Sequence, residues 1–148
     1  LGDFNNVLVS LIHAAEIFKF NLNILVPNKL IPSSLKFKNK NFKYTNFLTD
    51  INHGVKNADC IMTDVWISMG EKNTKKKIES LKKYQVNNKI MKLAKKNAIF
   101  MHCLPAHRNE EVTSQVLDSN QSVVLMQAKN RMFIQQSILN FLNKHSYE

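Results

Sequence analysis

The decapeptide Ile99-Phe100-Met101-His102-Cys103-Leu104-Pro105-Ala106-His107-Arg108 decides how this chain folds, because an apolar run leads directly into polar side chains and a Leu-Pro bend. The run from Ala98 to Met101 is too short and too apolar for a surface helix, and it follows a lysine-rich stretch with helical spacing. A buried parallel strand is therefore predicted here. Pro105 ends the strand and fixes the turn, which predicts an active-site loop after it.

Strand-like and helix-like segments alternate along the rest of the chain, which is the pattern of an α/β domain. The predicted strands are 22–26, 44–48, 59–63, 98–101 and 122–125. The predicted helices are 5–20, 49–56, 109–117 and 130–143, with lysine-rich helices between 70 and 96. The expected fold is a Rossmann-like parallel sheet flanked by helices.

The start of the chain lacks a strand that this fold requires. Leu1-Gly2-Asp3 passes directly into a helix, although a strand normally precedes such a turn. In a doubly wound sheet the first strand is central, and its loss would leave unpaired backbone groups on both neighbours. A sheet truncated at its N-terminal side is expected.

The charge of the chain does not favour a nucleic-acid partner. The 148 residues suit one domain, and they carry a formal net charge of +10. Nearly all positive charge is lysine, with Arg108 and Arg131 as the only arginines, whereas proteins that read phosphates and base edges rely on arginine. The lysine runs have spacings typical of solvated helix faces. A non-catalytic basic binding module remains an alternative.

The sequence predicts a cytoplasmic protein without a membrane partner. No apolar run approaches the roughly 20 residues of a membrane-spanning helix, and the N-terminus lacks the pattern of a signal peptide. Cys60 and Cys103 are too few for a disulfide scaffold, so free thiols in a reducing compartment are expected.

Polar residues follow several predicted strands and, in a parallel sheet, meet at its carboxyl edge, where such sheets bind ligands. The segments expected there are 2–7, 64–70, 102–108 and 127–131. Asp64 and Ser68, with backbone amides before Gly70, are suited to hold the ammonium and carboxylate groups of an amino acid. The same residue types cap helices, which is the simpler interpretation of this loop alone. Asn5-Asn6 likewise either caps a helix or directs its positive end at a carboxylate.

Cys103 is compatible with three roles: nucleophile, metal ligand or small buried hydrophobic residue. His102 and His107 lie close in sequence, but this spacing matches no common zinc pattern, so no metal is expected. Adjacent strand residues point to opposite faces, which argues against a nucleophile pair of Cys103 and His102. Arg131 stands near the start of the last predicted helix and is a further candidate.

Six segments that span essentially the whole chain resemble, in order, those of one family. They are Gly2-Asp3-Phe4-Asn5-Asn6-Val7, Thr63-Asp64-Val65-Trp66-Ile67-Ser68-Met69-Gly70, Tyr84-Gln85-Val86-Asn87, His102-Cys103-Leu104-Pro105, Glu110-Glu111-Val112-Thr113 and Asn130-Arg131. The chain resembles ornithine carbamoyltransferases, and the Asp-x-x-x-Ser-Met-Gly and His-Cys-Leu-Pro segments are highly specific in combination. Aspartate carbamoyltransferases are expected to have proline in place of Cys103 and no Ser-Met-Gly loop, which makes them the weaker match.

The resemblance implies an enzyme that transfers the carbamoyl group of carbamoyl phosphate to the δ-amino group of L-ornithine, giving L-citrulline and phosphate. It implies a role in arginine biosynthesis or the urea cycle, a homotrimer and no cofactor. It places Asn6 on the ornithine carboxylate and Asp64 and Ser68 on the α-ammonium group, with the Met69 backbone nearby.

The resemblance also assigns the residues at the reacting groups. Cys103 would lie beside the δ-amino group, and the backbone carbonyls of Cys103 and Leu104 would meet carbamoyl phosphate. Arg131 would polarise carbamoyl phosphate, and the Leu104-Pro105 peptide bond would be cis. Since an alkylammonium group must lose its proton before it attacks, orientation and electrostatics suffice and no covalent intermediate is needed. Cys103 is accordingly interpreted as an orienting residue.

Two residues depart from the family pattern, and the segments that bind phosphate in the other half of the family's sequence do not occur in this chain. Phe4 stands where glycine is usual, and Lys129 stands where an acidic residue is expected beside Arg131. The Ser-x-Arg-Thr-Arg phosphate loop and the His-Pro-x-Gln segment do not occur in residues 1–148. The chain is expected to be the C-terminal, ornithine-binding domain, inactive without the carbamoyl-phosphate-binding domain. A transcarbamylase with another amine or amino-acid acceptor is the alternative enzyme.

In the family that the chain resembles, the closing helix packs back across the other domain. The last predicted helix of this chain corresponds to that closing helix. Its apolar residues are expected to be partly uncovered here. These residues are Phe133, Ile134, Ile138 and Phe141.

Overall fold

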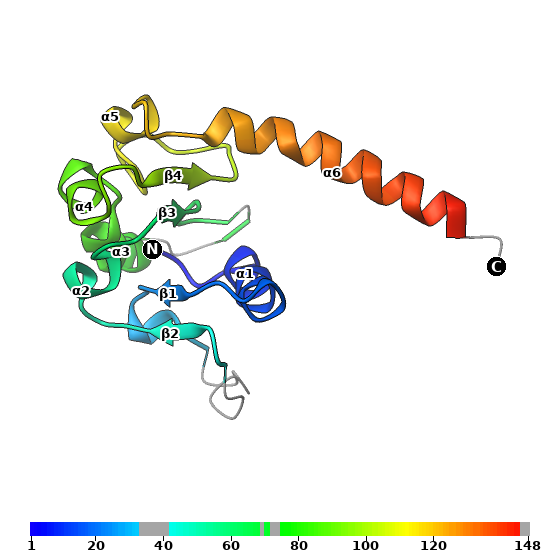
Figure 1. Cartoon of the computed structure of the whole chain (residues 1–148). Helices are drawn as coiled ribbons and strands as arrows, with labels where there is room; N and C mark the ends of the chain where they lie inside the picture. The colour runs from blue at the N-terminus through cyan, green and yellow to red at the C-terminus, as the bar shows by residue number, and fades with distance from the viewer. Residues whose placement is uncertain (33–41, 69, 72–74, 146–148) are drawn as a thin grey trace.

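The computed structural model describes residues 1–32, 42–68, 70–71 and 75–145. Helices and strands alternate along the chain, and all strand pairs are parallel, which confirms the predicted α/β class (Figure 1). The strands are β1 (Leu22–Ile24), β2 (Thr45–Phe47), β3 (Cys60–Thr63) and β4 (Ile99–His102). The α-helices are α1 (Asn6–Phe18), α2 (Ile51–Val55), α3 (Lys75–Leu81), α4 (Asn88–Leu93), α5 (Ser114–Leu117) and α6 (Val124–His145), and the 3-10 helices are η1 (Asn28–Leu30) and η3 (Lys82–Tyr84).

The strands form two separate pairs, β1 with β2 and β3 with β4. The first residues of the chain lie between the pairs: the Leu1 amino group donates to the Met62 carbonyl at 2.8 Å, and the Gly2 N–H donates to the Leu25 carbonyl at 3.0 Å. A cavity of about 700 Å³ runs along β1 and β3. The sheet is therefore interrupted at the position where the sequence predicts a missing central strand.

Gly2 allows the chain to enter this narrow space. Its φ is +118°, a conformation that L side chains rarely adopt. A Cβ atom there would lie 3.2 Å from Thr63 Oγ1 and 3.3 Å from Trp66 Nε1. The turn that leads from Leu1 into α1 therefore depends on glycine.

The main core surrounds β3 and β4, because their alternate residues point into it. Ile61 on β3 and Phe100 on β4 are buried opposite each other in the parallel register. They pack in one cluster with Trp66, Leu81 and Val116, which come from the surrounding loop and helices. Phe4 packs against a second cluster, which contains Ile12 of α1 and Ile24 of β1. This packing holds the carboxyl ends of β3 and β4 in place.

Two predicted elements are wrong. The predicted helix 109–117 is helical only over Ser114–Leu117, because Val112 pairs with Val86 and Glu111 is buried. The predicted strand 122–125 contributes only a bridge between Ser122 and Phe100, and α6 begins at Val124. The closing helix thus starts six residues before the predicted Asn130, and Arg131 lies about two turns inside it.

The long helix α6 extends away from the strands and the other helices (Figure 1). Its apolar residues Phe133, Ile134, Ile138 and Phe141 are exposed, as the sequence predicts. Among the described residues, no helix combines the length and the apolar character needed to cross a membrane.

Candidate functional site

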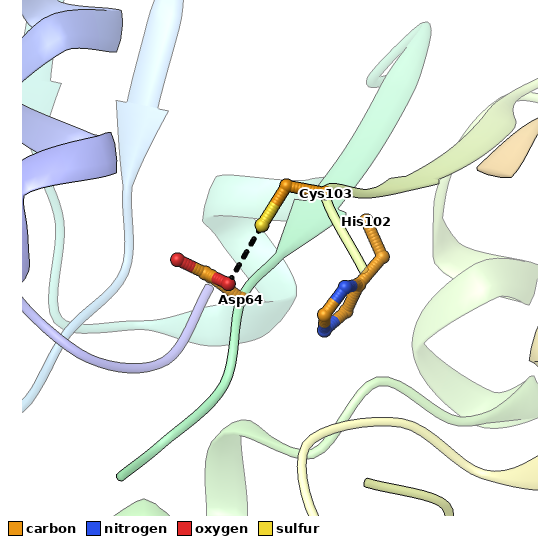
Figure 2. A group of neighbouring side chains, drawn as sticks. All are labelled: Asp64, His102 and Cys103. Atoms are coloured by element: carbon orange, nitrogen blue, oxygen red, sulfur yellow. Dashed lines mark hydrogen bonds between the residues drawn. The ribbon is translucent and has the colours of Figure 1, made fainter. Parts of the chain in front are cut away.

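Asp64 is the centre of a polar cluster at the carboxyl edge of β3 and β4. It follows β3 directly, and Cys103 follows β4 directly, so the parallel pairing brings the two side chains together. The Cys103 thiol donates a hydrogen bond to Asp64 Oδ1 at 2.9 Å (Figure 2). Asn5 Nδ2 donates to Asp64 Oδ2 at 2.8 Å, and the Val65 N–H donates to Oδ1 at 2.8 Å. Three segments distant in sequence therefore meet at one carboxylate.

Asn5 does two things at once, and the sequence identified only one of them. Its side-chain oxygen accepts from the Leu8 N–H at 3.1 Å, which caps α1. Its amide nitrogen is left to bind Asp64. The N-terminus of α1, with its positive dipole end, is thereby held beside the carboxylate. The double asparagine signalled a cap, but the contact with Asp64 depends on tertiary structure.

The thiol of Cys103 is a hydrogen-bond donor at neutral pH. Burial raises its pKa to about 12, assisted by the hydrogen bond to Asp64 and by the negative charge of that carboxylate, while the positive charge of Arg131 acts in the opposite direction. A thiolate is the nucleophilic form of cysteine, and this site disfavours it. The geometry therefore suits Cys103 to orientation and not to covalent attack.

Alkylation of Cys103 should be slow. Between the ordinary pKa of 9.0 and the value of about 12, the thiolate population at pH 8 falls roughly a thousandfold. In a Cys60→Ser background, iodoacetamide labelling followed by mass spectrometry should show this lag relative to the same protein in urea. Asp64→Asn should accelerate labelling, because the carboxylate no longer opposes ionisation. Equal labelling rates in the folded and unfolded protein would contradict the raised pKa.

His102 supports the Cys103 loop from the other side. The ring is fully buried, and its Nδ1 accepts from the Leu104 N–H at 2.9 Å. The proton is consequently assigned to Nε2, which lies 3.2 Å from Glu111 Oε1. Leu104, with a φ of 56°, is followed by the cis peptide bond to Pro105, which confirms the predicted cis geometry. The His102 ring thus bonds to Leu104 and Glu111, whereas the Cys103 thiol bonds to Asp64.

A lysine joins the two loops that border Asp64. Lys77 Nζ lies 2.8 Å from Asp3 Oδ2 and 2.8 Å from Glu71 Oε1. Burial works against its charge, but the hydrogen bonds and charges of the two carboxylates prevail and raise the pKa of Lys77. Glu71 also accepts from the Ser68 N–H at 3.2 Å, so the loop is held from both ends. Within the lysine run 75–77, nothing in the sequence distinguished Lys77 from its neighbours.

The remaining predicted residues lie at different distances from this cluster. Asn6 is exposed as the first residue of α1, directly after the cap. Ser68 and Arg131 are exposed, and within the described part of the chain no hydrogen bond joins their side chains to Asp64 or Cys103. The positive charge of Arg131 is nevertheless close enough to offset part of the rise in the pKa of the Cys103 thiol. Met69 lies outside the described residues.

Ligand atoms of Asp64, His102 and Cys103 lie within 4.8 Å of one another, which is the spacing of a group that can share a metal ion. Protein groups already occupy them. Asp64 accepts from Asn5, Val65 and Cys103, and both nitrogens of His102 are engaged. These hydrogen bonds compete with a metal ion for the same ligand atoms.

A model of one protein family covers nearly the whole chain: "Aspartate/ornithine carbamoyltransferase, Asp/Orn binding domain" matches residues 1–142. Ornithine carbamoyltransferases of Rhodopseudomonas palustris and Bradyrhizobium diazoefficiens are 50% and 51% identical over 140 residues, which is 93% of this chain. These matches cover 45% and 46% of the two relatives, so the chain spans about half their length.

Solved structures show the same similarity. Ornithine carbamoyltransferase from Pyrococcus furiosus is 39% identical with a TM-score of 0.83, over 93% of this chain and 46% of that one. The anabolic enzyme from Campylobacter jejuni is 31% identical with a TM-score of 0.87, over 97% of this chain and 50% of that one. The family model, which matches residues 1–142, spans Asn5, Asp64 and Cys103.

Proposed function

This chain belongs to the aspartate/ornithine carbamoyltransferase family, and from that premise we propose that residues 1–148 form the ornithine-binding domain of an ornithine carbamoyltransferase. The observation that carries the proposal is the meeting of Asn5, Asp64 and Cys103 at one sheet edge. The whole enzyme transfers the carbamoyl group of carbamoyl phosphate to the δ-amino group of L-ornithine, releasing citrulline and phosphate.

Asp64 and the N-terminus of α1 bind the two ends of the α-amino-acid group. The half-buried carboxylate of Asp64 accepts the α-ammonium group, and the exposed Ser68 hydroxyl adds a second oxygen. Asn6 and the positive end of α1 bind the α-carboxylate. Because Asn5 ties α1 to Asp64, the two subsites are fixed relative to each other. The Met69 backbone is assigned to the same pocket by family membership alone.

Cys103 and Arg131 act at the reacting groups. The thiol, protonated because its pKa is raised to about 12, orients the δ-amino nitrogen without attacking it. The backbone carbonyls of Cys103 and Leu104 meet the amide of carbamoyl phosphate. Arg131 stabilises the charge that develops on the carbonyl oxygen, which is the usual electrostatic contribution to such a transfer. The neutral δ-amine attacks the carbamoyl carbon, the bond from that carbon to the phosphate oxygen breaks, and the leaving phosphate takes up the proton that the amine loses. No covalent intermediate with the protein forms.

A second domain supplies the anchors of carbamoyl phosphate. The relatives are about twice as long as this chain. In addition, α6 exposes an apolar face that includes Ile134, Ile138 and Phe141, and a covering surface would remove that face from water. Residues 1–148 alone should therefore be inactive. For the whole protein we propose a cytoplasmic homotrimer that acts in arginine metabolism.

An acceptor panel tests the proposed specificity. The full-length protein, supplied with carbamoyl phosphate, should give its highest kcat/KM with L-ornithine, and N-acetylornithine and putrescine should be poor acceptors. Both lack one of the charged α-groups that Asp64 and Asn6 are proposed to bind. A preference for putrescine or an acetylated acceptor would favour a related transcarbamylase instead.

Asn6→Ala should raise the KM for L-ornithine about tenfold with little change in kcat, because Asn6 binds a group that does not react. Steady-state kinetics of the full-length protein give both values. Asn97→Ala, at an exposed asparagine in the turn before β4, is the matched control and should behave like the unaltered protein. A lower kcat with unchanged KM in Asn6→Ala would contradict this role.

A further inference from the structure

Glu111 has a buried carboxylate oxygen that accepts no hydrogen bond from the described residues. The side chain is fully buried, and its Oε1 accepts from the His107 N–H at 2.6 Å and lies 3.2 Å from His102 Nε2. Its Oε2 has no hydrogen-bond partner among the described residues. A buried polar atom without a hydrogen bond lowers the stability of the folded protein, so buried atoms of this kind usually bind a further group. Glu111 Oε2 is therefore a candidate ligand atom.

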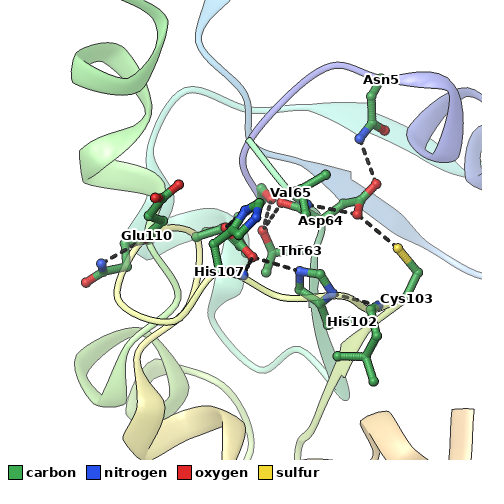
Figure 3. Close-up of polar contacts among 12 residues, drawn as sticks. Asn5, Thr63, Asp64, Val65, His102, Cys103, His107 and Glu110 are labelled. Atoms are coloured by element: carbon green, nitrogen blue, oxygen red, sulfur yellow. Dashed lines mark hydrogen bonds and ion pairs between the residues drawn. The ribbon is translucent and has the colours of Figure 1, made fainter. Parts of the chain in front are cut away.

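Two further ligand-bearing side chains flank this oxygen. His107 Nδ1 lies 3.9 Å from Glu111 Oε2, too far for a hydrogen bond. A Glu110 carboxylate oxygen belongs to the same group, in which all three ligand atoms lie within 4.8 Å of one another. Figure 3 shows His107 between Glu110 and the His102 ring, with Cys103 on the other side of that ring. This group is distinct from the Asp64 cluster, and the proposed reaction does not use it.

The backbone holds these three residues in position. Gln85 Nε2 donates to the carbonyls of Asn109 and Glu110 at 2.9 and 2.8 Å. The Asn109 N–H donates to the Val112 carbonyl at 2.7 Å, which closes the turn. His107 and Glu110 are exposed, so the group opens to solvent on one side.

We propose that His107, Glu110 and Glu111 bind a divalent transition-metal ion of the zinc class. One imidazole nitrogen and two carboxylate oxygens are ligands that such ions accept, usually at about 2.0–2.2 Å. At these bond lengths, tetrahedral ligands lie roughly 3.4 Å apart. The exposed His107 ring must therefore approach Glu111 Oε2 by about half an ångström from its 3.9 Å, and ligand atoms that lie up to 4.8 Å apart must approach each other by up to about 1.4 Å. Two carboxylates beside a neutral imidazole also balance the charge of the ion. Water completes the coordination on the open side.

Bound metal would also stabilise the Cys103 loop. Glu111 Oε1 contacts His102, and His102 accepts from the Leu104 N–H directly after Cys103. An ion on Oε2 would fix the Glu111 carboxylate and, through it, this chain of contacts. The expected consequence is a higher melting temperature with metal, since a ligand that binds only the folded state stabilises it.

Cobalt spectroscopy and zinc calorimetry on the chelator-treated full-length protein test the proposal. Co²⁺ should bind one equivalent and produce visible d–d absorption without a thiolate charge-transfer band. Zinc affinity should fall at least tenfold in both His107→Ala and Glu110→Gln, a loss typical of altered metal sites. These two variants avoid the buried Glu111 and should keep the metal-free melting temperature.

The control variants decide between this site and the Asp64 cluster. Cys103→Ala and His53→Ala, the latter at an exposed histidine on α2, should each bind zinc within about twofold of the unaltered protein. Loss of binding in Cys103→Ala together with a thiolate band would place the ion at Asp64, His102 and Cys103 and overturn the proposal. So would unchanged affinity in His107→Ala, or the absence of saturable binding.

Discussion

Asp64→Asn is expected to lower kcat/KM for L-ornithine by about a thousandfold in the full-length protein, which corresponds to about 4 kcal/mol of transition-state stabilisation. The change removes the negative charge that is proposed to bind the α-ammonium group, and a charge-assisted hydrogen bond contributes about 1.5–3 kcal/mol. It also disturbs two neighbours. An asparagine side chain offers one acceptor oxygen where Asp64 now offers two, to Cys103 and Asn5.

A second aspartate on the same strand pair provides the control. Asp59 lies just before β3, is exposed, and forms an ion pair with Lys95 at 2.6 Å. Asp59→Asn should keep nearly all activity, because an exposed ion pair contributes about 1 kcal/mol or less to stability. If Asp64→Asn retained more than a tenth of the original kcat/KM, the proposed ammonium site would be wrong.

Phe100→Ala should destabilise the folded protein by about 3–5 kcal/mol, the usual cost of removing a large aromatic side chain from a core. Phe100 is fully buried at the centre of β4 and packs in the main cluster with Ile61 and Trp66. Its loss leaves a cavity beneath β4, the strand that leads into Cys103. Denaturant unfolding monitored by circular dichroism measures the change.

Phe18→Ala is the matched substitution at the surface. Phe18 ends α1 and is 75% exposed, so its truncation should change the unfolding free energy by no more than about 0.5 kcal/mol. Similar losses in both variants would mean that the core is not centred on β4.

The sequence predicted the strands and the Asp64 cluster best, for a simple physical reason. Short apolar runs before Asp64 and Cys103 indicate buried strands, and parallel pairing necessarily brings the residues after them to one edge. The structure shows these two side chains in direct hydrogen-bond contact. No spacing rule predicts the third partner, Asn5, because it depends on how α1 is positioned.

The wrong elements arise where tertiary contacts outweigh local preference. Glu110-Glu111 resembles the acidic first turn of a helix, yet Glu111 is buried against His102, and Gln85 binds the carbonyls of Asn109 and Glu110. Likewise, Ser122 to Leu125 is apolar enough for a strand, but the pairing is limited to one bridge between Ser122 and Phe100, made by the Val123 N–H and the Gln121 carbonyl, before α6 begins. In both places the deciding contact comes from a distant part of the chain, which local sequence patterns do not encode.

Citrulline formation is the most direct test of the claim that this chain is the ornithine-binding half of a carbamoyltransferase. The full-length protein, given L-ornithine and carbamoyl phosphate, should release citrulline and phosphate in equal amounts, whereas purified residues 1–148 should release none. Absence of citrulline with the full-length protein, or its formation by residues 1–148 alone, would contradict the account.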